Sequence, residues 1–111
     1  MITVREIDNM NDLKSFYSDS AESLHIVKIG APWCGPCMAL SDTLRELDAE
    51  RIGNTLISEV DIESEGGEEI ATEYKVRSIP VTLFVKNSEV LSKTIGSMSR
   101  EIIYDKIEEY K

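Results

Sequence analysis

Two cysteines separated by two residues are the part of this sequence best suited to covalent chemistry. Cys34 and Cys37 are the only cysteines among the 111 residues, and segment 30–37 also holds the only tryptophan, Trp33. An apolar run at 24–29 comes before this segment, and apolar residues with helical spacing follow it at 38–52. The pattern predicts a strand that delivers two thiols to the first turn of a helix.

A helix start would make Cys34 a nucleophile. With Cys34 at the N-cap and Pro36 in the first turn, unpaired backbone N–H groups and the positive end of the helix dipole face the Cys34 sulfur. They stabilise the thiolate, which is the reactive form. Cys37, one turn further on, is expected to be buried, close enough to Cys34 to form a disulfide, and able to attack a mixed disulfide at Cys34. We therefore expect Cys34 to attack and Cys37 to resolve.

Two other interpretations of the cysteine pair are weaker. A zinc site needs further soft or imidazole ligands, and the chain offers no other cysteine and a single histidine, His25, on a strand remote from the pair. A purely structural disulfide across so short a loop would add little stability. A Cys-x-x-Cys pair beside a strand–helix pattern favours redox chemistry, and no metal is expected.

Composition limits the classes of protein to consider. The chain is long enough for one domain, and 41% hydrophobic with 30% charged residues is ordinary for a globular protein. A formal net charge of −9 argues against binding to nucleic acid or to an anionic membrane surface. The start of the sequence lacks the pattern of a signal peptide, and no apolar run approaches a membrane span. We expect the reducing cytoplasm.

Strand and helix patterns alternate along the chain. The expected strands are 2–7, 24–29, 55–61, 79–85 and 89–95, and the expected helices are 10–17, 38–52, 68–74 and 99–110. This alternation predicts a single α/β domain over residues 1–111, with a mixed central sheet of about five strands flanked by about four helices.

Trp33-Cys34-Gly35-Pro36-Cys37 resembles the WCGPC active site of the thioredoxin family. Segment 76–82 resembles the family's cis-proline loop, and Gly96 its late glycine. The resemblance implies the thioredoxin fold and a protein-disulfide reductase whose redox-active group is its own Cys34–Cys37 disulfide, with no other cofactor. It also implies protein disulfides as substrates and a thioredoxin reductase as electron donor. We expect the protein to be a monomer.

The resemblance also implies a surface for substrates. In the family this proline is cis and packs against the cysteine pair, and the backbone of the preceding residue pairs with the substrate. Pro80 and Ile79 would take these roles. The expected substrate-binding residues are Trp33, Gly35, Pro36, Ile79, Pro80 and Gly96.

Lys28 and Glu59 depart from the family pattern. Thioredoxins usually carry an aspartate at the first position and a lysine at the second. Lys28 shares a strand side with Leu24 and Ile26, where an unpaired ammonium would be costly to bury. We predict that Lys28 and Glu59 form an ion pair behind Cys37. Lys28 would then stabilise the Cys37 thiolate, and Glu59 would be the candidate proton acceptor through water, which makes both candidate catalytic residues.

Two alternative functions stay open. A glutaredoxin-like, glutathione-dependent reductase would more typically carry tyrosine at the position of Gly35. A thioredoxin-fold subunit that serves only in assembly would use the surface of Trp33 and Pro80, and it would keep its function when both cysteines are replaced by serine.

Overall fold

The computed structural model describes residues 2–111, and Met1 lies outside the described part. Five strands in this part form one mixed sheet: β1 (Val4–Glu6), β2 (His25–Gly30), β3 (Leu56–Asp61), β4 (Val81–Lys86) and β5 (Glu89–Ile95). Their order is β1-β3-β2-β4-β5, with β1, β3 and β2 parallel and β4 and β5 antiparallel to their neighbours. The strand β2 is central and all its residues are buried, as its apolar run predicts.

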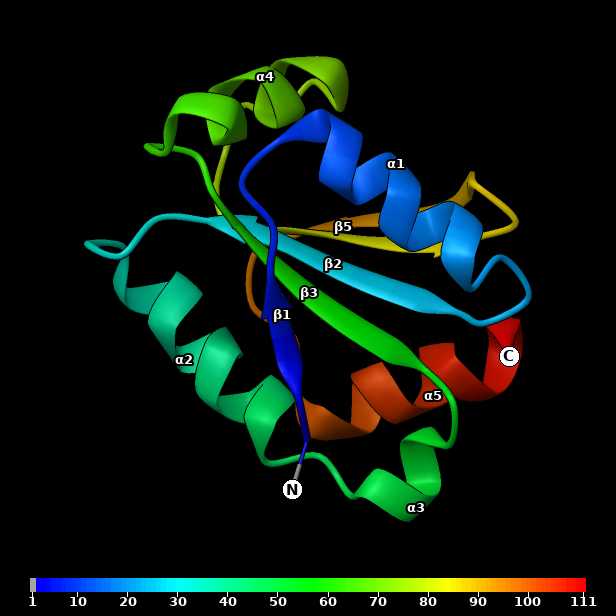
Figure 1. Cartoon of the computed structure of the whole chain (residues 1–111). Coiled ribbons are helices and arrows are strands. Elements are labelled where there is room, and N and C mark those ends of the chain that lie inside the picture. Colours follow the sequence, from blue (N-terminus) through cyan, green and yellow to red (C-terminus); the bar gives the residue numbers. More distant parts are fainter. Residues whose placement is uncertain (1) are drawn as a thin grey trace.

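Helices cover both faces of the sheet (Figure 1). They are α1 (Met10–Asp19), α2 (Gly35–Arg45), α3 (Ala49–Ile52), α4 (Glu65–Glu73) and α5 (Arg100–Tyr110). The helices α1 and α4 lie on one face, and α2 and α5 on the other. Each helix starts at a side chain that accepts a backbone N–H of the first turn, and these N-caps are Asn9, Cys34, Asp48, Ser64 and Ser99.

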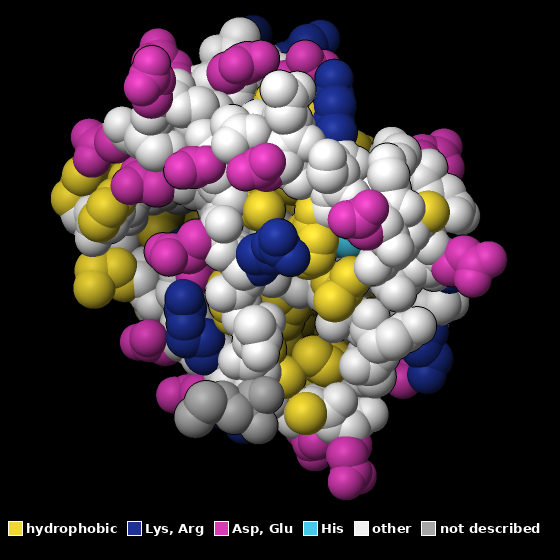
Figure 2. Space-filling model, viewed as in Figure 1, with side chains coloured by type: hydrophobic (Ala, Val, Ile, Leu, Met, Phe, Trp, Pro, Cys, Tyr) yellow, Lys and Arg dark blue, Asp and Glu magenta, His cyan; other side chains and the backbone are white. Residues whose placement is uncertain are grey.

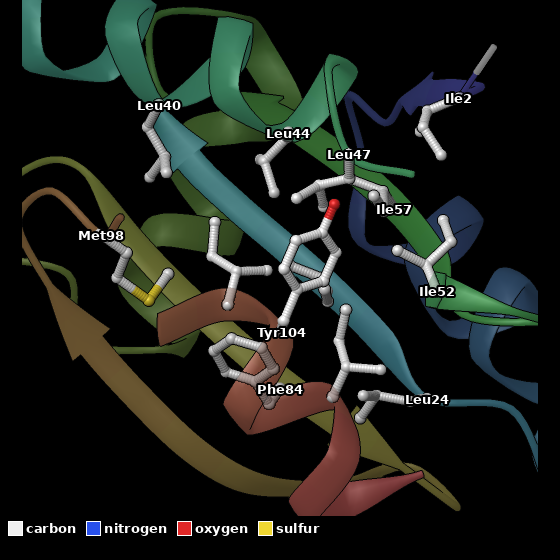
Figure 3. Packing of buried hydrophobic residues seen from close by; sticks show 13 residues of the cluster. Ile2, Leu24, Leu40, Leu44, Leu47, Ile52, Ile57, Phe84, Met98 and Tyr104 are labelled. Atoms are coloured by element: carbon white, nitrogen blue, oxygen red, sulfur yellow. The ribbon is translucent and has the colours of Figure 1, made fainter. Parts of the chain in front are cut away.

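Two apolar cores hold the sheet between its helices. On one side, Leu40 and Leu44 of α2 meet Phe84 of β4 and Tyr104 of α5 (Figure 3). On the other side, residues of α1 and α4 pack on the opposite face of the same strands, and this core includes Leu13, Val27, Ile29, Ile70 and Leu83. Because β2 is packed on both faces, the turn that follows it is firmly placed.

The expected helix 38–52 is two helices, so the sheet has five helices around it instead of about four. The helix α2 ends at Arg45, and Asp48 caps α3 by accepting the backbone N–H of Glu50 at 2.9 Å. Leu47 lies in the intervening turn and is buried with the core. The apolar spacing therefore continues through the break, and for that reason the sequence pattern did not reveal it.

The helix α4 begins at Glu65, three residues earlier than expected, so that Gly66 and Gly67, which precede the expected helix 68–74, lie in its first turn. A Cβ on Gly66 would collide with the backbone carbonyl of Asp8, and one on Gly67 with that of Asp61. The two glycines therefore let α4 approach the ends of β1 and β3 closely.

Candidate active site

Cys34 lies at the N-cap of α2, as predicted. Its Sγ accepts the backbone N–H of Cys37 at 3.2 Å, and Pro36 occupies the first turn. Cys34 and Cys37 form a disulfide with 5.2 Å between their Cα atoms. Cys34 is 7% exposed and Cys37 is fully buried. The more accessible sulfur is thus the one that the helix N-terminus stabilises.

The residues expected to contact substrate lie around this disulfide. Trp33 is 66% exposed. The Ile79–Pro80 bond is cis, and Ile79 packs against the cluster that contains both cysteines. Gly96 has a φ of 93° and donates its N–H to the Pro80 carbonyl at 2.8 Å, which ties it to the same loop. The structure therefore brings the predicted surface residues to one end of the sheet.

The predicted ion pair between Lys28 and Glu59 is present. The two residues face each other across the parallel strands β2 and β3, and Lys28 Nζ lies 2.9 Å from Glu59 Oε2. Their side chains are 9% and 12% exposed, respectively. The interaction is therefore largely shielded from solvent, and each charge compensates the burial of the other.

Ser41 and Arg45 of α2 complete this network, and sequence reasoning did not single them out. Lys28 Nζ donates to Ser41 Oγ at 2.5 Å, and the Ser41 hydroxyl donates to Glu59 Oε2. Arg45 donates to Glu59 Oε1 at 2.5 Å. The spacing Cys37, Ser41, Arg45 places all three on one face of a helix. That spacing is the signal that could have identified them.

The network keeps Glu59 ionised. Burial raises the pKa of the Glu59 carboxyl, but hydrogen bonds from Arg45, Ser41 and Lys28 outweigh it and hold the pKa below its usual value. A carboxylate of lowered pKa is a weak base. Glu59 is therefore better suited to hold Lys28 in place than to take up a proton.

Gly30 lies between Lys28 and Cys37. A Cβ at this glycine would be 2.8 Å from Cys37 Sγ and 3.2 Å from Lys28 Cε. The lysine stem and the cysteine sulfur thus border the same small space. The Lys28 stem therefore lies beside the Cys37 sulfur, while its Nζ is bonded to Ser41 and Glu59.

A groove of about 470 Å³ opens beside the network and exposes its outer edge to solvent. Pro32 and Met38 line it at the cysteine end, and Arg45 and Glu59 line it further along α2. Apolar side chains cover the turn before α2, whereas acidic side chains gather over α4 (Figure 2). Solvent therefore reaches Arg45 but hardly reaches Lys28.

His25 takes no part in the site. It is 1% exposed and packs edge-on against Phe16 and Tyr17, with its Nε2 3.0 Å from the Ser20 carbonyl oxygen. Among residues 2–111, no group of three or more His, Cys, Asp or Glu side chains is arranged to hold a metal ion. No helix in this range is long and apolar enough to cross a membrane.

Comparison with known proteins agrees with this geometry. The sequence model of the thioredoxin family matches residues 7–109. The chain is 36% identical over 109 residues to a chloroplastic M-type thioredoxin of Spinacia oleracea, covering 96% of this chain and 59% of that protein. It is 31% identical to a thioredoxin of Bacillus subtilis, covering 87% of this chain and 91% of that protein.

Solved structures show the same fold. The thioredoxin of Fasciola hepatica superposes with a TM-score of 0.85 at 25% identity, covering 96% of this chain and 99% of that one. The reduced thioredoxin of Schistosoma mansoni gives a TM-score of 0.83, also at 25% identity, over 97% of this chain and 98% of that one. These likenesses confirm the fold predicted from the sequence.

The lowered pKa of Glu59 leads to a prediction about stability. Because the pKa is lower in the folded protein, the Glu59 charge stabilises the fold above the usual value of 4.5, and this contribution is lost as pH falls through the folded pKa. Glu59→Gln leaves Lys28 uncompensated and should lower the free energy of unfolding at neutral pH by roughly 2 to 3 kcal/mol. Urea unfolding across pH measures the difference in free energy of unfolding between the parent and Glu59→Gln. This difference should shrink below pH 4.5.

The matched control is Glu63→Gln, which removes the same charge from an exposed position. Its effect should be small at every pH. A deficit for Glu59→Gln that stays constant with pH would contradict the assigned ionisation of Glu59.

Proposed function

The chain belongs to the thioredoxin family and is a thiol–disulfide oxidoreductase, and we propose that it works as a reductase of protein disulfides. The observation that carries the proposal is the disulfide at the start of α2, with the more accessible sulfur at the N-cap and the buried one in the first turn. In the reduced protein, the N-cap thiolate meets the substrate first. The buried thiol is protected until a mixed disulfide has formed.

The proposed reaction has two exchanges. The Cys34 thiolate attacks one sulfur of the substrate disulfide, forming a mixed disulfide and releasing the other substrate sulfur as a thiolate. Cys37 then loses its proton to solvent, and its thiolate attacks the Cys34 sulfur, which closes the Cys34–Cys37 disulfide and releases the second substrate thiolate. Two electrons pass from the protein to the substrate, and the released thiolates take up protons from solvent.

The ion pair acts on the second exchange. Lys28 stabilises the Cys37 thiolate as it forms, because its side chain borders the same space as the Cys37 sulfur. Glu59 holds Lys28 there through the 2.9 Å ion pair. The low pKa of Glu59 favours this positioning role over proton uptake.

Substrates bind at the surface around the disulfide. Exposed Trp33, with Gly35 and Pro36 of the first turn, offers an apolar contact for the substrate chain. The backbone of Ile79, before cis Pro80, pairs with an extended substrate segment, and Gly96 borders this loop. Backbone pairing tolerates many sequences, which suits a reductase of many proteins.

The electron donor we propose is a thioredoxin reductase, and the compartment is a reducing cytoplasm where the dithiol is regenerated. Names of relatives also include chloroplastic and mitochondrial thioredoxins. A coupled turnover assay compares NADPH with a thioredoxin reductase against glutathione with its reductase. Faster turnover with glutathione would favour the glutaredoxin-like alternative.

Replacing each cysteine separates the two proposed roles. Cys37→Ser should accumulate a mixed disulfide with a protein substrate through Cys34, because the resolving thiol is absent. Cys34→Ser should lose reduction of insulin disulfides and trap nothing. Non-reducing electrophoresis with mass spectrometry identifies the trapped species. Trapping by Cys34→Ser instead would reverse the assignment, and full function without both cysteines would favour an assembly subunit.

Removing the Lys28 charge tests the second exchange. Lys28→Met keeps the apolar stem but not the ammonium, so the Cys37 thiolate should form less readily and the mixed disulfide should resolve about tenfold more slowly. Stopped-flow measurement of substrate thiol release separates this step from the first attack, which should change little. Equal slowing of both steps would indicate general structural damage.

A further inference from the structure

The Glu59 carboxylate is shared between two cations on different sides. Its Oε2 faces Lys28 and Ser41, whereas its Oε1 faces Arg45. A Lys28–Glu59 pair alone would be neutral, and its two opposite fields would largely cancel at Cys37. With Arg45 bound to the outer oxygen, the cluster has two cations for one anion. Because Arg45 holds the outer oxygen, the carboxylate is drawn toward the groove, and the Lys28 charge on the side of the disulfide is less fully compensated.

Arg45 is too distant to act on the cysteines by itself. Eight residues of helix place it about 12 Å along the α2 axis from Cys37, beyond a Debye length of about 8 Å at physiological salt. Its side chain is also 46% exposed, which screens it further. Any effect of Arg45 on the cysteine pair must therefore pass through the Glu59 carboxylate that it contacts.

Other charges face the same groove. Glu6 and Asp8 near β1, Asp42 on α2 and Asp61 at the end of β3 all line it. All four are exposed, unlike Lys28 and Glu59. Glu6 and Asp42 attract Arg45 and raise the pKa of its guanidinium, after the larger effect of its bond to Glu59. Water screens these four carboxylates, so they act mainly on the outer end of the network.

We propose that Arg45 is a positioning residue that sets the balance between dithiol and disulfide in this protein, by binding the outer oxygen of Glu59 and leaving the Lys28 charge free to stabilise the thiolate of the reduced pair. This inference rests on the proposed action of Lys28 on Cys37. A cation cluster that stabilises the reduced form makes the protein a milder reductant. Its preferred substrates would then be strained or exposed disulfides, which are reduced most readily.

Glutathione exchange measures this balance directly. Two glutathione thiols reduce the Cys34–Cys37 disulfide, giving the protein dithiol and one glutathione disulfide, with two electrons and two protons transferred. One thiol of the protein dithiol then loses a proton to solvent, to an extent set by the pKa of that thiol. The equilibrium constant follows from the dithiol fraction across a series of glutathione ratios.

Arg45→Gln should lower this equilibrium constant about two- to threefold, since an exposed ion pair has a modest effect. Arg45→Lys keeps the cation and should restore most of the loss. The matched control is Arg51→Gln on α3. Arg51 stacks on Tyr104, and its replacement changes the net charge by the same amount as Arg45→Gln. Lys28→Met should lower the constant further, by roughly tenfold, and Glu59→Gln should raise it.

A double substitution separates an electrostatic role from a structural one. If Arg45 acts through Glu59, then Arg45→Gln should have no further effect in a Glu59→Gln background. The effect of Arg45→Gln should also fade as pH drops below the pKa of the Cys37 thiol, where no Cys37 thiolate remains. Glu59 stays charged over that range because its pKa is lowered.

The possible outcomes are distinct. If the equilibrium constant is unchanged in Arg45→Gln but clearly lower in Lys28→Met, the role of Arg45 is overturned and the action of Lys28 stands. No change for either would overturn the action of Lys28 as well. Arg45→Gln could also lower the equilibrium constant in a way that Arg45→Lys does not restore, or that persists at low pH or in the Glu59→Gln background. Any of these results would assign Arg45 a packing role and contradict the proposal.

Discussion

A partly buried carboxylate bound by cations from two elements is the interaction on which the rest of the site depends. Glu59 of β3 joins Lys28 of β2 to Ser41 and Arg45 of α2, so one side chain fixes the helix against the sheet behind the cysteines. Neither Lys28 nor Glu59 could be buried alone without a large desolvation cost. Their mutual compensation is therefore what allows the Lys28 stem to lie beside the buried Cys37 sulfur.

We propose that the two sulfurs are stabilised by different sources of positive potential. Cys34 lies at the N-terminus of α2, and its Sγ accepts the backbone N–H of Cys37 at 3.2 Å. Cys37 is buried, and the side chain of Lys28 lies next to its sulfur at the space left open by Gly30. The family pattern that the sequence departs from has a carboxylate at the position of Lys28. In this chain the position behind the resolving cysteine holds a cation instead of a base, and we propose that this changes how the Cys37 thiolate forms.

Much of this arrangement could be predicted because it depends on neighbouring strands. The β2 and β3 patterns placed Lys28 and Glu59 at equivalent positions, and parallel pairing brought them together. The N-cap role of Cys34 followed from its place before Pro36. Ser41 and Arg45 were missed because strand spacing does not say which polar residues of a following helix face the sheet. The break after Arg45 was missed because buried Leu47 continues the apolar spacing, and the early start of α4 because close contact with Asp61 selects Gly67.

The central claim is that Lys28 stabilises the Cys37 thiolate electrostatically. The most direct measurement is an NMR titration of the reduced protein with 13C-labelled cysteine β-carbons, which follows Cys37 and Cys34 separately, in the parent and in Lys28→Met. We predict that removing the ammonium raises the pKa of the Cys37 thiol by about one unit and moves that of Cys34 much less. An unchanged Cys37 titration, with the Lys28→Met protein still folded, would contradict the account. The ion pair would then have only a structural role, holding α2 against the sheet.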